Sequence, residues 1–450
     1  MIRSSVIHPR APYALATITL MLAGCASYSP KPLAAGIAPA DTSALVRDAA
    51  SIDRPFLKPS NIDLGAPLDD NAIAVMAVLG NPDLKAMRVK AGVADAQVFA
   101  ARLLPDPTFT LGLGHLLSGP DPVDEIASGL GIDLNALRTS KVRRRLAEAQ
   151  AKQVRLDLAW AEWQTAGQAR LQAVRIRRLE HSIELITIGR DGAQSLLDRN
   201  LRAAARGDVA ADAVQAARAS TVAAQDKLVV AENDLNTARL ELVKLLGLPP
   251  GIILRLAPAT AADPAIDAVK LTQRALDNRA DLQALRAGYD SQEAAVHKAI
   301  LDQFPNLALN LNFTRDTSKN NILGPTVDFT LPLWNRNRGG IAVERATREQ
   351  LKAEYDARLF QTRADIAAAV SAVLLARRQR DAIRVQLPEL ERLAVVSRKA
   401  ATRGDLSRAA AEAAEGTLGD KRVELATAEQ TIDEAMIALE LLTGAPREDW

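Results

Sequence analysis

Histidine and cysteine, the residues that most often bind metals or act as nucleophiles and bases, are rare in this 450-residue chain. The four histidines, His8, His115, His181 and His297, are far apart, and Cys25 is the sole cysteine. The sequence has no phosphate-binding loop of the Walker type, no paired metal-ligand motif and no nucleophile motif. We therefore expect no catalysis, no cofactor and no bound metal. The net charge of +2 gives no reason to expect a nucleic-acid partner.

Cys25 is the residue with a definite chemical prediction, because it ends a secretory signal. Arg3 and Arg10 precede an apolar run from Ala14 to Leu22, which is too short for a transmembrane helix. The run ends in Leu-Ala-Gly-Cys, which resembles the bacterial lipobox, so we expect cleavage before Cys25 and its acylation. Ala26, rather than Asp, follows, which in such signals implies sorting to the outer membrane. The alternative is a plain signal with an incidental cysteine.

The chain contains one helical pattern twice. Arg206-Gly207-Asp208 recurs as Arg403-Gly404-Asp405, 197 residues later. Heptad positions downstream keep the same offset without a gap: Leu228, Leu235 and Leu242 in the first copy, and Leu425, Ile432 and Leu439 in the second. A shared Gly-Asp start and a shared heptad indicate an internal duplication.

Each Arg-Gly-Asp is expected to be the tip of a helical hairpin. Gly207 and Gly404 can adopt positive φ at a helix C-terminus, which L side chains disfavour. Asp208 and Asp405 would then serve as N-caps of the next helices, because a carboxylate accepts from free N–H groups there. Turn chemistry explains both copies, so an adhesion tripeptide is not needed.

Two hairpins of alternating polarity interrupt the helical patterns. Apolar residues occupy most alternate positions of about 107–115 and 125–135, and again of about 305–314 and 325–334, with Gly, Asn, Thr, Ala or Asp between them. Period two indicates strands with one apolar and one small or polar face, as in a transmembrane β-barrel. Four strands cannot close a barrel, and lipid does not tolerate open edges, so several chains must share one. Two ordinary soluble hairpins are the alternative.

The fold predicted from these patterns is mainly α with a transmembrane β part, built as a duplicated helix–hairpin–long helix–helix repeat. Its expected divisions, in chain order, are a signal peptide (1–24), an extended lipid-tethered segment (25–66), a first repeat (67–250), a connector (251–267), a second repeat (268–446) and a tail (447–450). The first repeat is expected to contain a long helix at about 139–204 and a shorter one at about 208–246. The corresponding helices of the second repeat are expected at about 340–402 and 405–443. Within the first repeat, one helix is expected from about Asp69 to Leu104. Pro388 should bend the second long helix locally.

This order of elements resembles the TolC-like outer-membrane efflux factor family. Matching pieces are Asn81-Pro82-Asp83-Leu84, Leu103-Leu104-Pro105-Asp106-Pro107 and Leu246-Gly247-Leu248-Pro249. The run from Leu331 to Gly339, Leu-Pro-Leu-Trp-Asn-Arg-Asn-Arg-Gly, resembles the strand-to-helix junction of the cobalt–zinc–cadmium branch of that family. The resemblance covers nearly the whole mature chain.

The resemblance implies a homotrimer with a trimeric α-helical barrel in the periplasm and a shared 12-strand β-barrel in the outer membrane. It also implies a periplasmic adaptor and an inner-membrane pump, usually proton-driven and of the RND type, as partners, with outer-membrane lipid around the barrel. The adaptor-docking role falls on the hairpin tips, Arg206, Gly207, Asp208, Arg403, Gly404 and Asp405.

Acids near the second tip are candidates for a periplasmic gate. The family member best known for a closed tip has aspartates at steps that fall on Ala410 and Ala413 here, so this sequence departs from that pattern. Asp405, Glu412 and Glu415 are the nearby carboxylates, and a ring of acids would favour cations. A solvated helix face is the plain alternative for them.

The function expected from the sequence is a passive export duct, with heavy-metal cations suggested as cargo by the family branch alone. The same duct could instead carry drugs, organic solvents or, in type I secretion, polypeptides. A lipid-anchored periplasmic coiled-coil adaptor is an alternative of another class. Adaptors, however, have one helical hairpin per chain and lack this duplication.

Overall fold

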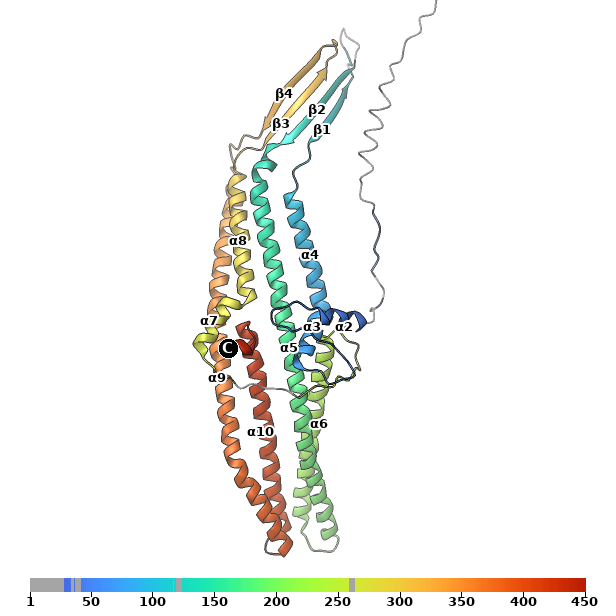
Figure 1. Cartoon of the computed structure of the whole chain (residues 1–450), viewed down its shortest axis with the longest axis vertical. Helices are drawn as coiled ribbons and strands as arrows, with labels where there is room; N and C mark the ends of the chain where they lie inside the picture. Colours follow the sequence, from blue (N-terminus) through green and yellow to red (C-terminus); the bar gives the residue numbers. More distant parts are fainter. Residues whose placement is uncertain (1–27, 34–35, 37–41, 116, 119–123, 259–263) are drawn as a thin grey trace, which may run out of the picture. The chain divides into compact units, whose positions relative to one another are not determined.

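The computed structural model describes residues 28–33, 36, 42–115, 117–118, 124–258 and 264–450. The chain divides into two units, Met1–Pro39 and Ala40–Trp450, and every element described below belongs to the second. In chain order (Figure 1) these are α2 (Thr42–Ala50), α3 (Asp70–Gly80), α4 (Pro82–Arg102), β1 (Thr108–Gly114), β2 (Glu125–Asp133), α5 (Leu134–Ala204), α6 (Ala211–Leu245), α7 (Ala268–Asn278), α8 (Ala280–Leu301), β3 (Leu307–Arg315), β4 (Asn321–Phe329), α9 (Arg338–Arg403), α10 (Arg408–Thr443) and the short η2 (Arg447–Asp449).

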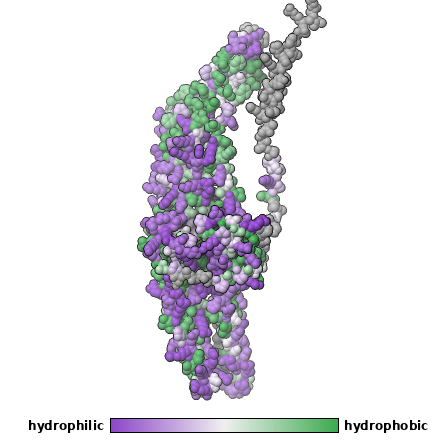
Figure 2. All heavy atoms as spheres, viewed as in Figure 1, coloured by the Kyte–Doolittle hydropathy of each residue, from purple (hydrophilic) through white to green (hydrophobic). Residues whose placement is uncertain are grey.

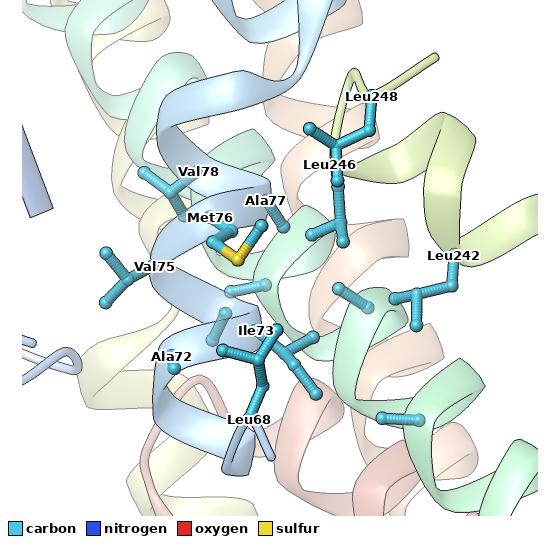
Figure 3. Packing of buried hydrophobic residues seen from close by; sticks show 14 of the residues in the cluster. Leu68, Ala72, Ile73, Val75, Met76, Ala77, Val78, Leu242, Leu246 and Leu248 are labelled. Carbon is cyan, nitrogen blue, oxygen red and sulfur yellow. The ribbon is translucent and has the colours of Figure 1, made fainter. Parts of the chain in front are cut away.

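The main hydrophobic core forms around α3, whose sequence Ala-Ile-Ala-Val-Met-Ala-Val is buried on all sides. A helix that is apolar all round is stable only when other elements cover every face. Ile73 and Met76 pack against Leu242 and Leu246 from the end of α6, and alanines of α5 complete the cluster (Figure 3). The small alanine side chains of α5 allow close approach of the helices.

The two repeats use the same junction, at which one helix follows another end to end. Asn81 accepts from the N–H groups of Asp83 and Leu84 at the start of α4, and its amide donates to the carbonyl of Leu245 at the end of α6 (3.1 Å). In the second repeat, Arg279 before α8 donates to the carbonyl of Leu442 in α10 (3.3 Å). The Asn81 side chain therefore satisfies orphan groups of two helix ends at once, whereas the Arg279 side chain satisfies a carbonyl of α10 and does not cap α8.

The remaining helices form one layer. α9 packs on α10 and α8, both of these pack on α5, and α5 packs on α6 and α4. In Figure 1 the upper helices α4 and α8 lie above α6 and α10. α9 runs through Pro388 without interruption. Long helices with polar stretches are only marginally stable in water on their own, so the packing of neighbouring helices against one another stabilises them.

The four strands form one antiparallel sheet in the order β1-β2-β3-β4. Both hairpins of the sequence are present, and β2 of the first pairs with β3 of the second. The sheet therefore joins the two repeats. β4 begins and ends earlier than the predicted strand at 325–334, because Pro325 is tolerated inside it at an edge while Pro332 lies beyond its end.

Three further boundaries differ from the sequence expectations. Residues 42–50 form α2 rather than extended chain, because Leu45 and Ala49 bury against the main core. The helix expected from Asp69 to Leu104 is two helices, since Asn81 ends α3 and begins α4. The long helices begin earlier than expected, at Leu134 and Arg338.

Candidate functional site

The sheet has two chemically different faces, fixed by its register. Phe109 lies opposite Leu130, which lies opposite Leu311 on the next strand. Directly opposed residues share a face, so apolar side chains of all four strands gather on one side. Most of them are exposed in the single chain: Phe109, Leu111, Leu113, Ile126, Leu130, Ile132, Leu307, Leu309, Leu311, Phe313, Leu323, Val327 and Phe329. A face of this extent needs an apolar environment or partner.

The opposite face is polar and closely fitted. Asn310 donates to Asp328 (2.6 Å), and Asn312 donates to Thr326 (2.8 Å). The same two asparagines lie over Gly131 and Gly129, where an added Cβ would come within 2.2 Å and 2.6 Å of their amide oxygens. The glycines thus make room for a hydrogen-bonded polar layer, which suits contact with water.

Among the described residues, the sheet and the helix layer are open at matching edges. β1 pairs only with β2, and β4 only with β3. The helix layer ends in α6 with α4 on one side and in α9 on the other. α4 leads into β1, and β4 leads into α9, so the open edges are continuous along both layers (Figure 1). The outer helices expose apolar residues there: Val89, Val93, Val222, Val229, Leu374, Leu375 and Val385 among them.

One stretch of α9 is apolar enough, by length and composition, to cross a membrane, and most of it is exposed in the single chain. α9 forms an edge of the helix layer and packs along its length on α10 and α8. An exposed apolar stretch of this kind is equally suited to packing against another helix.

Both hairpin tips have the same backbone geometry. Gly207 has φ 79° and Gly404 has φ 87°. The N–H groups of Asp208 and Asp405 each donate to a carbonyl five residues back at 2.9 Å, and the glycine N–H groups donate three residues back. This is the Schellman motif, in which the residue at C′ must be left-handed. The positive φ predicted for both glycines is confirmed.

The aspartates of the tips do not cap the following helices as expected. α6 begins at Ala211 after Ala210, without a side-chain cap, and α10 begins at Arg408 with Ser407 as its cap. Asp208 instead accepts from Arg206 (2.8 Å), and Asp405 lies 3.6 Å from Arg403. Each aspartate directly follows the left-handed glycine, and the next helix begins three residues after the aspartate. The aspartate therefore lies too early in the chain to be its N-cap. Both tips therefore present an exposed Arg–Asp pair.

The three candidate gate acids are each paired with an arginine. Asp405 pairs within its own tip. Glu412 pairs with Arg199 and so connects α10 to α5, whereas Glu415 pairs with Arg398 and connects α10 to α9. No group of three or more His, Cys, Asp or Glu in the described parts of the chain could hold a metal ion. In the single chain Glu412 and Glu415 therefore connect helices, whereas Asp405 does not.

A ladder of ion pairs joins the two repeats along α5 and α10. Besides Arg199–Glu412, the structure contains Arg170–Glu440 (2.8 Å), Arg175–Glu434 (3.0 Å) and Arg178–Asp433 (2.6 Å). As one partner's number rises the other's falls, as it must between antiparallel helices. Sequence reasoning missed this ladder, although the recurring arginines of α5 and acids of α10 were a visible signal for it.

Within this ladder, the contact with Arg175 favours the charged form of the Glu434 carboxylate. Burial raises the pKa of Glu434, but hydrogen bonds from Arg175 and Gln430 outweigh it, so the net pKa lies below its ordinary value. A lowered folded-state pKa contributes stability above the unfolded pKa, and this contribution is lost as pH falls through the folded value. The Arg175–Glu434 pair thus contributes stability at neutral pH and loses it in acid.

Comparison with known proteins identifies the arrangement. Residues 271–445, most of the second repeat, match the outer membrane efflux protein family. The cobalt-zinc-cadmium resistance protein CzcC of Cupriavidus metallidurans is 24% identical over 296 residues, which are 64% of this chain and 69% of that protein. Residues 271–445 of this chain therefore resemble the outer membrane efflux protein family.

Solved structures of outer-membrane channels share the fold of this chain. CusC aligns with a TM-score of 0.67 at 16% identity, over 84% of this chain and 92% of that one. The outer-membrane channel OprN gives 0.70 at 17% identity, over 94% and 99%. CmeC of Campylobacter jejuni gives 0.70 at 14% identity, over 93% and 94%. At these identities the likeness shows the fold, which covers both repeats.

The match to the outer membrane efflux protein family and the likeness to outer-membrane channels place the chain in the outer membrane, as the sequence predicted. Cys25, the predicted site of lipid attachment, lies outside the described residues. The tip residues are brought to one end of the helix layer by the two hairpins α5–α6 and α9–α10 (Figure 1), whereas the sheet forms the other end. The apolar face of the sheet and the two exposed Arg–Asp pairs therefore lie at opposite ends of the helix layer (Figure 1).

Proposed function

We propose that three copies of this chain close into a passive duct, with a 12-strand β-barrel in the outer membrane and a helical tunnel in the periplasm. The observation that carries the proposal is the matching open edges of the sheet and the helix layer. Unpaired strand edges are not tolerated in lipid, and small barrels need about eight strands. Three copies of four strands satisfy every edge, with the apolar face outward and the asparagine-lined face around water.

The arrangement supports transport without catalysis. A duct wall needs a continuous polar lining, and Asn310 with Asn312 supplies one through hydrogen bonds to neighbouring strands. The tips, Arg206–Asp208 and Arg403–Asp405, would dock a periplasmic adaptor that connects the duct to an inner-membrane pump of the proton-driven RND type. The coiled-coil adaptor alternative is disfavoured, because it leaves the two-faced sheet without a use.

Heavy-metal cations are the cargo we propose, supported by the Leu331–Gly339 junction and by the likeness to the cobalt-zinc-cadmium resistance protein. Deleting the gene should lower the Zn²⁺, Co²⁺ and Cd²⁺ concentrations that stop growth and leave tolerance to organic dyes and solvents unchanged. Growth inhibition curves, with a plasmid-borne copy as the control, measure both. Sensitivity to the organic compounds alone would favour the drug or solvent alternative, and loss of a secreted polypeptide would favour type I secretion.

Acylation of Cys25 is a separate prediction from the Leu-Ala-Gly-Cys run. The mature chain should begin at Cys25 and carry lipid, because cleavage before a lipobox cysteine follows its modification. Multiple acyl chains would add a stable tether beside the barrel. Mass spectrometry of the purified protein should find the lipid-modified terminal peptide. An unmodified terminus at another residue would contradict the tether, and Cys25→Ser provides the matched negative control.

We further propose that the Glu412–Arg199 pair helps to hold the periplasmic end closed. It is the rung of the α5–α10 ladder nearest the tips, so its loss frees the end of α10 while the rungs beyond remain. Glu412→Gln should raise the conductance of the duct in a planar bilayer without partner proteins. Glu389→Gln is the control, since Glu389 pairs only one turn along α9 with Arg392. Equal conductance of Glu412→Gln and the unaltered protein would contradict this role.

A further inference from the structure

The segment that joins β4 to α9 carries apolar side chains that are exposed in the single chain. Leu331 and Leu333 are 62% and 61% exposed, and Trp334 is 84% exposed, the most of any tryptophan in the described chain. The N–H of Thr330 donates to the carbonyl of Asn306 (3.3 Å), so the segment still runs beside the base of β3 where it leaves the sheet. Leu331 and Leu333 therefore continue the apolar positions Val327 and Phe329 beyond the last strand residue.

Hydrogen bonds hold this segment in place despite its backbone strain. Arg336 and Asn337 both have positive φ, 47° and 50°, which costs free energy at non-glycine residues and is kept only where surroundings enforce it. Asn337 donates to the carbonyl of Ala299 at the end of α8 (2.8 Å), which ties the turn to the helix layer. Arg336 and Arg338 donate back to the carbonyls of Pro332 and Trp334. Two guanidinium groups are thus held beside the exposed tryptophan.

The helix turns below the sheet add positive charge at the same level. Near the start of α5, Lys141, Arg144 and Arg145 are exposed, and near the start of α9, Arg338 and Arg345 are exposed. The opposite end of the sheet carries polar loops such as Asp316–Asn320 instead. Figure 2 shows hydrophobic residues gathered where the sheet meets the helices, with hydrophilic residues predominating below. Apolar and cationic groups therefore adjoin at one level of the chain.

We propose that residues 331–338 bind phospholipids at the inner surface of the outer membrane, with Trp334 among the headgroups and Arg336 and Arg338 on their phosphates. This inference rests on the proposed function, which places the sheet in the bilayer. An indole ring is stable where one side is apolar and the other is wet, and arginine binds phosphate with several donors. Clusters of basic residues at a membrane surface favour anionic lipid. The surface thereby fixes the depth of the barrel.

Depth-dependent fluorescence quenching tests the position of Trp334. The full chain is reconstituted into phosphatidylcholine–phosphatidylglycerol vesicles in which the phosphatidylcholine is brominated at carbons 6 and 7, or at carbons 11 and 12. The shallow bromines should quench more strongly than the deep ones. Trp334→Phe should lose most of this quenching, because Trp160, Trp163 and Trp450 lie along the helix layer far from the sheet and remain unquenched.

The results separate this inference from the proposed function. Vesicle flotation first shows whether the chain is inserted. Insertion without quenching of Trp334, or stronger quenching by the deep bromines, overturns the headgroup position and leaves the duct intact, whereas failure to insert overturns both. Native mass spectrometry tests the phosphate contacts: Arg336→Gln with Arg338→Gln should lose retained phosphatidylglycerol, while Arg315→Gln at the far end of β3 should retain it. Equal retention by both variants overturns the role of the arginines.

Discussion

Export should be abolished in the double variant Gly207→Val with Gly404→Val, while protein level and oligomer persist. An added Cβ at either glycine meets no atom within 4 Å, so the whole effect comes from the positive φ. A β-branched residue in the left-handed region costs on the order of 1–2 kcal/mol, enough to unwind the Schellman turn. The long helices pack elsewhere, so the strain should stay at the tips and change the surface offered to the adaptor.

The measurement is adaptor crosslinking from Arg206 and Arg403, together with metal export. Gly404→Val alone should have a smaller effect, because one tip of each chain is left unchanged. Gly112→Ala in β1 is the control, since its Cβ would meet Ala127 at an ordinary 3.7 Å and should not affect docking. Normal crosslinking and export by the double variant would show that the tips are only turns.

A charge on the apolar face of the sheet should be the second large effect. Leu311 lies in the middle of β3 between Leu130 and Pro325, on the face we assign to lipid. Leu311→Arg should lower the amount of inserted protein severely, because an arginine near the bilayer centre costs about 2–4 kcal/mol in each chain. Outer-membrane fractionation, with the heat-resistant oligomer band as a second readout, measures the loss.

The same charge on the other face supplies the control. Ala308 lies opposite Asp133 and Asp328 on the polar face, so Ala308→Arg would find carboxylates and water there. This variant should insert normally and alter only ion selectivity. If Leu311→Arg inserted as well as Ala308→Arg, the assignment of the two faces would be wrong, and the sheet would belong to a soluble packing arrangement.

Much of the fold could be read from the sequence because its signals are local and repeated. Alternation of polar and apolar residues predicts the face of most strand residues, and the observed register agrees with it, although Ser128 lies on the apolar face and Ile322 on the polar face. The glycine tips follow from backbone sterics that do not depend on distant contacts. The duplication strengthened each reading, since two copies of a weak pattern rarely arise together by chance.

The parts that failed depend on contacts between distant residues. Residues 42–50 belong to a segment rich in Pro, Ala, Ser and Asp without a sustained period, but they form a helix whose Leu45 and Ala49 pack into the main core. The N-cap role expected of Asp208 and Asp405 was wrong because two further residues separate each aspartate from the start of the next helix. The pairing of Glu412 with Arg199 depends on which helices become neighbours, and a single-helix pattern does not contain that information.

The central claim is that open edges of the sheet and helix layer are closed by further copies of the same chain. The most direct measurement is the native mass of the purified protein in a mild detergent. A value three times the mass of the mature chain, stable on dilution and lost together with membrane insertion in Leu311→Arg, is the expected result. A stable monomer that stays in solution without detergent would contradict the shared barrel.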